Sequence, residues 1–252
     1  MKRALLWLAG TLPILLLLTG AADATVSISL GDEGALTERV IQMIALLTIL
    51  SLAPSIVIMT TSFVRIVVVL SLLRTAIGLQ QSPPNVVLTS LAIFLTAFIM
   101  APVFTQSYDE GIRPLMDQEI EMEEAFTAAS APIKTFMLAH TREDDLALFI
   151  GFMEGDQPET AQDTPFFVVA PSFMISELRR AFEIGFLLFI PFLIIDLVVA
   201  SILMSMGMMM LPPIVISLPF KLIFFVLVDG WRLVTGSLVQ SFGTIGLPPG
   251  GS

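Results

Sequence analysis

Four long apolar segments, several of them interrupted by prolines and single charges, limit this chain to helical structures in or beside a membrane. They cover residues 40–73, 86–104, 184–206 and 211–228. Backbone N–H and C=O groups have no water partners in hydrocarbon, and a helix pairs them within its own segment. The composition agrees, with 56% hydrophobic and 13% charged residues and a mean hydropathy of +0.91, far from a soluble globular profile. We therefore predict an all-α, membrane-associated protein with two long kinked helical hairpins and an acidic, mainly helical extracytoplasmic insert.

The N-terminus has the pattern of a secretory signal peptide. Lys2 and Arg3 precede an apolar run at residues 4–18, and Ala22-Asp23-Ala24 provides a small-x-small cleavage pattern. We predict a signal peptide at residues 1–24, cleaved after Ala24, and an extracytoplasmic segment at residues 25–39. A retained first transmembrane helix is the alternative.

The first hairpin is predicted at residues 40–104. Its first apolar block, residues 40–73, would be roughly 50 Å long as one helix, against about 30 Å of hydrocarbon. Because proline removes a backbone hydrogen bond, Pro54 is predicted to kink this block and divide it. The pair Pro83 and Pro84 follows a polar turn and is predicted to start the return helix.

Arg65 lies within this first apolar block. An arginine at the centre of a transmembrane helix costs about 2.5–3.5 kcal/mol on insertion scales. We therefore expect Arg65 to face protein or water, as a paired or snorkelling structural charge.

Residues 105–183 are predicted to form an acidic periplasmic insert that ends in an amphipathic helix. Between residues 105 and 175, fourteen acidic residues stand against three basic ones. Thr141 and Asp144 have the spacing of a capping box, and His140, in a polar segment, is predicted to be a surface side chain. The acids lack the spaced ligand pattern of a calcium loop, so a solvated acidic face is preferred.

The second hairpin is predicted at residues 184–242, followed by a tail at residues 243–252. Its turn centres near Met208 or Met209, so Asp196 lies twelve or thirteen residues before the turn and Lys221 twelve or thirteen after it. In an antiparallel hairpin the two charges lie at nearly the same depth. Asp196 either pairs with Lys221 and fixes the hairpin register, or carries protons or cations through a relay. Prolines again mark the kinks and the turn, at Pro191, Pro212, Pro213 and Pro219.

A cluster of methionines occupies the turn of this hairpin. Methionine is unbranched and polarizable, so a cluster of it forms an apolar surface that adapts to different partners. Core filling at a helix turn is the simpler interpretation, and composition alone favours it. The cluster comprises Met204, Met206, Met208, Met209 and Met210.

Several function classes are disfavoured by the residue content. A net charge of -10 disfavours nucleic-acid binding, and zero cysteines with one histidine leave no thiolate site or histidine cluster. No nucleotide-binding motif occurs, and we predict no catalytic residues, no metal site and no cofactor. Because the apolar segments are kinked and carry charges, they should be buried against other protein, which predicts an obligate oligomer.

The chain resembles the FliP/SctR family of type III secretion export-gate proteins. The resemblance covers roughly residues 40–242 and is carried by specific stretches. These are the segments from Leu52 to Ile56, Thr61 to Leu70, Gln80 to Asn85, Thr141 to Leu148, Phe173 to Leu178, Asp196 to Ser201, Met204 to Pro213, Ser217 to Lys221 and Asp229 to Trp231.

This resemblance implies a non-enzymatic subunit of a protein export pore in the bacterial inner membrane, at the flagellar basal body. It implies a homo-pentamer that winds with FliQ and FliR into a helical ring, with FliO as assembly helper, the larger export-gate proteins as further partners and unfolded flagellar subunits as cargo. The methionine cluster would then be the gasket that seals the closed pore. The signal peptide and length favour the flagellar branch over the virulence branch, and an ion or proton transporter subunit that uses Asp196 is the alternative of another class.

Overall fold

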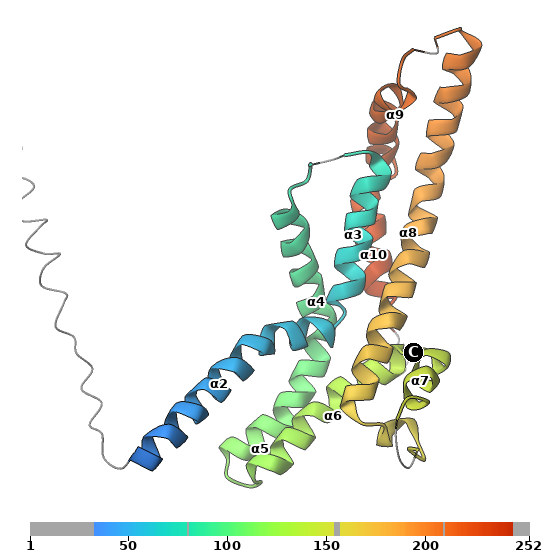
Figure 1. Cartoon of the computed structure of the whole chain (residues 1–252). Helices are drawn as coiled ribbons and strands as arrows, with labels where there is room; N and C mark the ends of the chain where they lie inside the picture. The colour runs from blue at the N-terminus through green and yellow to red at the C-terminus, as the bar shows by residue number, and fades with distance from the viewer. Residues whose placement is uncertain (1–32, 80, 154–156, 209, 244–252) are drawn as a thin grey trace, which may run out of the picture. The chain divides into compact units, whose positions relative to one another are not determined.

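The computed structural model describes residues 33–79, 81–153, 157–208 and 210–243, and within them every regular element is a helix (Figure 1). The chain divides into two compact units, Met1–Leu52 and Ala53–Ser252. The predicted signal peptide, Met209 and residues 244–252 of the predicted tail lie outside the described residues. The elements are α2 (Glu33–Met59), α3 (Phe63–Ile77), α4 (Asn85–Ser107), the π-helix η1 (Tyr108–Ile112), α5 (Arg113–Met116), α6 (Met122–His140), α7 (Glu143–Ile150), the 3-10 helix η2 (Ala161–Asp163), α8 (Phe166–Ser205), α9 (Pro213–Leu227) and α10 (Gly230–Gln240).

Helix α2 begins in the first unit and ends in the second. Its segment Arg39–Met59 is long and apolar enough to cross a membrane. Contrary to the sequence-based prediction, the helix is not divided at Pro54 but continues through it to Met59. The break lies at residues 60–62, where the hydroxyl of Thr60 donates to Ile56 O (3.0 Å) and that of Thr61 to Ile58 O (3.2 Å). Such hydroxyl bonds to the preceding turn compete with continuation of the helix.

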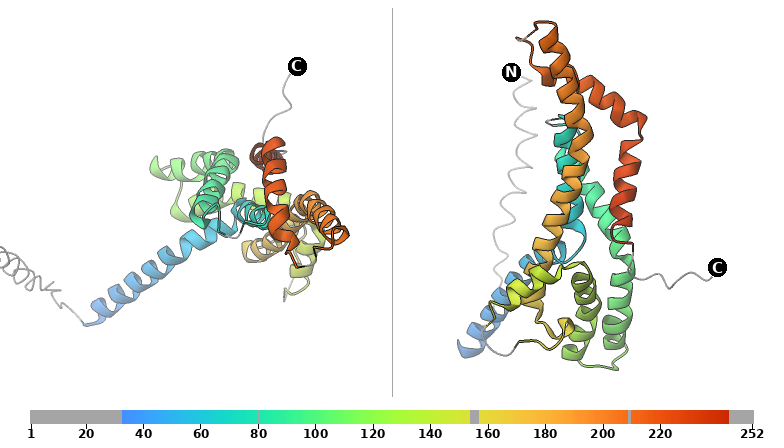
Figure 2. Two further views of the ribbon diagram at one scale, coloured as in Figure 1. Left: turned by 90° about the horizontal axis from the view of Figure 1, so that it is seen from above. Right: turned by 90° about the vertical axis from the view of Figure 1, so that its right-hand side faces the viewer.

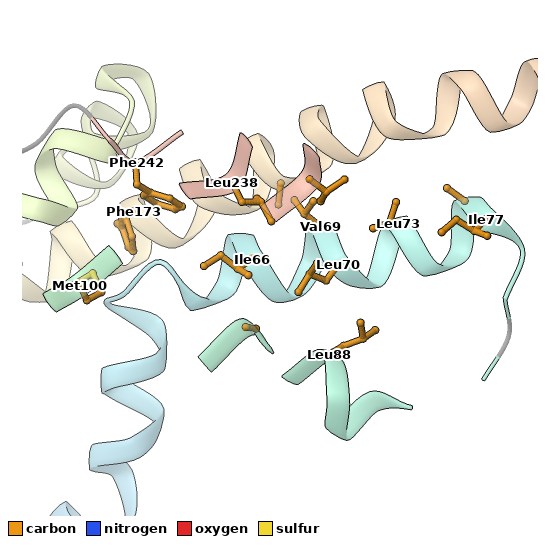
Figure 3. Close-up of a cluster of buried hydrophobic side chains, with 14 of the residues drawn as sticks. Ile66, Val69, Leu70, Leu73, Ile77, Leu88, Met100, Phe173, Leu238 and Phe242 are labelled. Atoms are coloured by element: carbon orange, nitrogen blue, oxygen red, sulfur yellow. The ribbon is translucent and has the colours of Figure 1, made fainter. Parts of the chain in front are cut away.

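Helix α3 lies at the centre of the second unit and packs along α8, with α4, α9 and α10 around it (Figures 1 and 2). Its buried residues recur every three or four positions, which places them on one helical face. Figure 3 shows this face packed against side chains from α4, α8 and the end of α10. Each fully buried Leu, Ile, Val or Phe side chain contributes about 1.5–3 kcal/mol to the stability of the folded state. The face consists of Ile66, Val69, Leu70, Leu73, Ala76 and Ile77.

The turn between α3 and α4 is built by glycine, proline and arginine. Gly78 ends α3 with φ 92°, a left-handed conformation that glycine adopts without steric penalty. Arg74 donates to Pro83 O (3.2 Å) and to Asn85 Oδ1 (2.5 Å), which ties the end of α3 to the start of α4. Pro84 is the N-cap of α4, in agreement with the predicted helix start.

The helical segment that begins with α4 is longer than predicted. The expected end at residue 104 is wrong, since α4 continues to Ser107 and passes through η1 into α5. Of the insert, α6 lies against η1 and α4, and α7 packs on α8. The predicted capping box at Thr141 is also wrong, because α7 begins at Glu143 and the Thr141 hydroxyl donates backwards to Met137 O (2.8 Å). A capping box occurs instead at Thr160 and Asp163.

The close approach of η1 to α6 depends on Gly111. A Cβ added there would lie 2.6 Å from the backbone N of Ala129 and 2.8 Å from Ala125 O. Because these are backbone atoms, the helices would have to separate. We expect Gly111→Ala to destabilise the folded protein by about 1–3 kcal/mol, measured as thermal unfolding in detergent.

Gly236→Ala is the matched control, since an added Cβ there meets nothing within 4 Å. Gly236 lies inside α10, where replacing glycine by alanine should stabilise the folded protein by about 0.5–1 kcal/mol. Equal stability of the Gly111→Ala protein and the unaltered protein would contradict the packing argument.

Helix α8 is a single helix of 40 residues, Phe166–Ser205. It begins before the predicted start at Pro171, continues through Pro171 and Pro191, and crosses the predicted segment boundary at residues 183–184. Each proline removes only one backbone hydrogen bond of so long a helix. At 1.5 Å per residue, α8 is about 60 Å long. The turn to α9 lies at one of its ends, and α6 and α7 pack near the other (Figure 1).

Among the described residues, three helical segments are long and apolar enough to cross a membrane, namely Arg39–Met59, Asn85–Met116 and Phe166–Ser205. Helices α9 and α10 meet at 61° (Figure 2) and form a fourth candidate only if the bent pair is one span. The prediction of an all-α fold with apolar helices suited to a membrane is confirmed.

Candidate functional site

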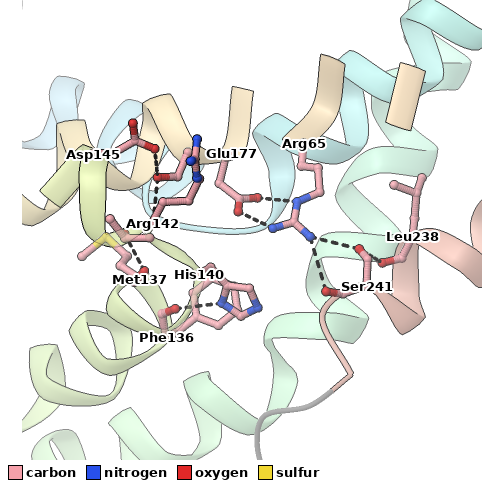
Figure 4. A network of polar contacts seen from close by, with 11 residues as sticks. Arg65, Phe136, Met137, His140, Arg142, Asp145, Glu177, Leu238 and Ser241 are labelled. Atoms are coloured by element: carbon pink, nitrogen blue, oxygen red, sulfur yellow. Dashed lines mark hydrogen bonds and ion pairs between the residues drawn. The ribbon is translucent and has the colours of Figure 1, made fainter. Parts of the chain in front are cut away.

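Arg65 and Glu177 form a buried ion pair between α3 and α8. Their side chains are 1% and 0% exposed. Arg65 Nε donates to Glu177 Oε2 (2.8 Å), and Nη2 bonds Oε1 of the same carboxylate (Figure 4). The third nitrogen, Nη1, donates to Ser241 Oγ (3.0 Å), and the guanidinium carbon lies 3.7 Å from the centroid of the Phe242 ring. Arg65 therefore joins α3, α8 and the residues that follow α10.

The sequence predicted that Arg65 faces protein or water, but it did not identify Glu177 as the partner. Glu177 stands beside Arg179 and Arg180 and was assigned to an amphipathic face. A signal was nevertheless present, because Phe173, Glu177 and Ala181 are four residues apart and share one face of a helix. All three are buried.

His140 is the clearest error of the sequence-based prediction. It was expected at the surface, but His140 is only 4% exposed. The ring packs against Phe136 and Phe242, with centroid distances of 4.5 and 5.1 Å, and its Nδ1 donates to Phe136 O (2.9 Å). The surrounding segment is polar on average, but α6 turns one face inward and His140 is on it.

The environment keeps His140 neutral. The pKa of His140 is lowered from 6.5 to about 4, chiefly by burial and in smaller part by the positive charges of Arg65 and Arg180. The hydrogen bond to the Phe136 carbonyl acts in the opposite direction but does not compensate. The imidazole is therefore a packing group near neutral pH.

A second polar contact fastens α7 to α8. Ser176 Oγ donates to Asp145 Oδ2 (2.6 Å) and accepts from the backbone N of Arg142 (3.0 Å). Figure 4 shows this contact close to the Arg65–Glu177 pair. The sequence-based prediction did not single out Ser176, since a lone serine in a helix carries little signal.

Asp196 on α8 and Lys221 on α9 form an ion pair, with 2.6 Å between Lys221 Nζ and Asp196 Oδ2. Lys221 Nζ also donates to Ala76 O at the end of α3 (3.3 Å), and Ser217 Oγ donates to Asp196 Oδ1 (2.5 Å). The Lys221 side chain is 4% exposed, whereas that of Asp196 is 34% exposed. Counting outward from the turn predicted this partner correctly, and it missed Ser217, which lies one helical turn before Lys221.

The methionine turn connects α8 to α9 and consists of residues 204–212. Its described methionines are not packed within their own chain, since Met206 is 63% exposed and Met210 98% exposed. Met204 and Met208 are 58% and 44% exposed. Gly207, with φ 74°, reverses the chain between them. Core filling within this chain is therefore excluded for these four side chains.

The prolines singled out from the sequence fall into two groups. Pro54, Pro191 and Pro219 lie inside helices. Pro83, Pro84 and Pro212 lie in turns or at helix caps, and Pro213 is the first residue of α9.

Known proteins resemble this chain over most of its length. The model of the FliP family matches residues 46–238. Flagellar biosynthetic protein FliP of Caulobacter vibrioides is 72% identical over 221 residues, covering 88% of this chain and 83% of the relative. Proteins of the same name from Bacillus subtilis and Agrobacterium fabrum are 57% and 46% identical over 202 and 238 residues, covering 80% and 92% of this chain and 91% and 97% of the relatives. The range matched by the family contains the buried Arg65–Glu177 pair, the partly buried Asp196–Lys221 pair and the methionine turn.

Proposed function

Because this chain belongs to the FliP family, we propose that it is a pore-forming core subunit of the flagellar protein export gate in the bacterial inner membrane. Relatives at 72% and 57% identity are named flagellar biosynthetic proteins, which favours the flagellar branch over a virulence system. Candidate membrane-spanning helices support the location. Its cargo would be unfolded flagellar subunits, and its role would be structural and not enzymatic.

The observation that carries this proposal is the exposure of the methionine turn. Side chains that their own chain leaves 44–98% exposed, at the end of a long helix, are available to other molecules. Hydrophobic constrictions close pores by excluding water, and methionine adapts its shape to what it contacts. Met204, Met206, Met208 and Met210, with Met209 between them, would form a gasket that blocks ions yet yields to a polypeptide.

Assembly into a ring is the second part of the proposal. Large apolar side chains remain exposed along α4, α8 and α9, among them Phe94, Phe98, Phe186, Phe220 and Val226. Large apolar side chains exposed in such number are covered by other protein or by lipid in the functional molecule. We assign it to neighbouring copies, five in a ring, and to FliQ and FliR, with FliO assisting assembly and part of the chain on the periplasmic side.

Replacing Met208 and Met210 by alanine tests the gasket. We expect the closed gate to leak ions, because the smaller side chains leave a constriction that water can fill. The measurement is ion efflux from vesicles that contain the assembled gate without cargo. Met116→Ala with Met122→Ala is the matched control, since these residues are 68% and 71% exposed on α5 and α6. A gate that stays as ion-tight as the control would overturn the gasket.

The ion pair of Asp196 and Lys221 separates this proposal from a proton or ion transporter. If the pair fixes the register of α8 and α9, Asp196→Lys and Lys221→Asp should each reduce assembly, because each leaves a partly buried charge beside a like charge. Combining them should restore at least part of the assembly, measured as the yield of complex on size-exclusion chromatography.

The transporter alternative predicts a different pattern. Purified protein in vesicles would then move protons without partners, and Asp196→Asn would abolish the flux while assembly stays intact. Proton flux of this kind would show that Asp196 carries protons through a relay and does not serve to fix the register of α8 and α9.

A further inference from the structure

An open pocket of about 430 Å³ lies beside the Arg65–Glu177 pair. We call it the arginine pocket, and it is lined by Arg65, Arg142, Arg180, Glu183, Ile184 and Ser241. Three of its six lining residues are arginines, in a chain whose net charge is -10. They come from three segments of the chain, namely α3, the residue before α7, and α8. The fold, and not a local basic run, brings them together.

Three of the acids around the arginine pocket already have cationic partners. Glu177 is bonded to Arg65, Glu183 to Arg179 (3.1 Å) and Asp144 to Arg142 Nη2 (3.2 Å). These pairs compensate the negative charge of Glu177, Glu183 and Asp144.

Donors remain unused in the same place. Arg142 Nη1 is buried and has no hydrogen-bond partner in the described part of the chain. Arg180 is half-buried, and no described residue pairs with it by a hydrogen bond or an ion pair. A buried donor without a partner is unfavourable, because it has lost its hydrogen bonds to water. Both arginines line the pocket, and an anion is the acceptor that such unused donors would bind.

The position along the helices indicates where such an anion comes from. An uncharged apolar run of α8 begins at Ile184, which itself lines the pocket, directly after the charged residues Arg179, Arg180 and Glu183. The pocket therefore lies at the charged end of this run. Basic residues at this level of a membrane protein meet the phosphates of lipid headgroups.

We propose that the arginine pocket is a binding site for a phosphate group, supplied by the headgroup of an anionic phospholipid. Arg142 Nη1 and the guanidinium of Arg180 donate to the phosphate oxygens, since arginine binds phosphate through paired, charge-assisted hydrogen bonds. Arg65 also lines the pocket but stays bound to Glu177. Phosphate binding at this site does not depend on what passes through the pore. The proposal can therefore be tested separately from the proposed methionine gasket.

The test uses the full chain in its assembled complex, purified in mild detergent and washed free of lipid. Phosphatidylglycerol, phosphatidylcholine and inorganic phosphate are added separately, and bound molecules are counted by native mass spectrometry. We expect saturable binding of phosphatidylglycerol, weaker binding of phosphatidylcholine, and about a tenfold or greater loss of phosphatidylglycerol affinity in Arg180→Gln and in Arg142→Gln.

Arg113→Gln is the matched control. It removes the same charge from an exposed position on α5, and neither Arg113 nor its partner Asp109 lines the pocket, so its phosphatidylglycerol affinity should stay within about twofold of that of the unaltered chain. Saturable binding of inorganic phosphate with the same dependence on the variants would support the phosphate site and name free phosphate as a second source. Equal lipid binding by all variants, or no binding by the unaltered complex, would overturn the proposal. Because Arg180 has no partner to lose, its variant is expected to fold, and size-exclusion chromatography checks this.

Discussion

Glu177→Gln is expected to destabilise the folded chain by about 3–5 kcal/mol, the loss that follows when one partner of a buried ion pair is removed. Glutamine has nearly the shape of glutamate, so the change removes charge and leaves the packing. Arg65 would then be a cation with 1% exposure and no compensating anion. The result is measured as the midpoint and free energy of unfolding in denaturant, with the protein in detergent micelles.

The same α8 helix offers the control. Glu183 pairs with Arg179, but their side chains are 61% and 56% exposed. Exposed pairs of this kind contribute about 0–1 kcal/mol, so Glu183→Gln should change stability little. If Glu177→Gln were no more harmful than Glu183→Gln, the Arg65 charge would be compensated by something other than the pair.

Replacing both partners distinguishes the pair from its packing. In Arg65→Met with Glu177→Leu no buried charge remains, and apolar replacement of a buried ion pair is often neutral or stabilising. We expect this double variant to be more stable than Glu177→Gln alone. Because Arg65 also bonds Ser241 and contacts Phe242, the double variant should loosen the end of α10, visible as faster amide exchange there.

Lowering the pH from about 6.5 to 4 is expected to remove about 3 kcal/mol of stability through His140 alone. The pKa of His140 is lowered to about 4 in the folded protein, chiefly by burial, against 6.5 in the unfolded chain. Between these values the unfolded chain binds more protons than the folded one. Stability from this group is therefore complete above about pH 6.5 and decreases as the pH falls through that range.

Comparison with His140→Phe isolates this contribution from the many acids that titrate at low pH. Phenylalanine keeps the ring contacts with Phe136 and Phe242 but does not titrate. The difference in unfolding free energy between the two proteins should change by about 3 kcal/mol between pH 7 and pH 4. A difference that stays constant over this range would mean that the folded protein protonates His140 without penalty.

The sequence was informative where a residue's own chemistry decides its surroundings. Arg65 is too costly to expose to lipid, so its position in an apolar segment predicted that it faces protein or water, as a paired or snorkelling charge. Asp196 and Lys221 could be matched because residues equally far from a tight turn lie at equal depth. Pro84 starts α4 since a proline at a helix start loses no hydrogen bond.

Other features could not be derived, because they depend on contacts between segments distant in the chain. Glu177 lies 112 positions from Arg65 and Ser241 176 positions from it, and no local pattern encodes such pairs. The sequence-based prediction placed the break of the first apolar block at Pro54, but α2 ends at Met59. The hydroxyls of Thr60 and Thr61 bond back to the preceding turn there. Two threonines are a weaker helix-breaking signal in a sequence than a proline.

The sequence by itself determined the class of this protein, since long apolar segments permit only helices that pair their own backbone groups, and it located the methionine turn and the charges within the helices. Only the tertiary structure decided which of those charges are compensated and which are left free. Burial is a property of a helical face packed on another helix, so His140 became a neutral core group although its segment is polar. For the same reason Arg142 and Arg180 kept unused donors although acids surround them.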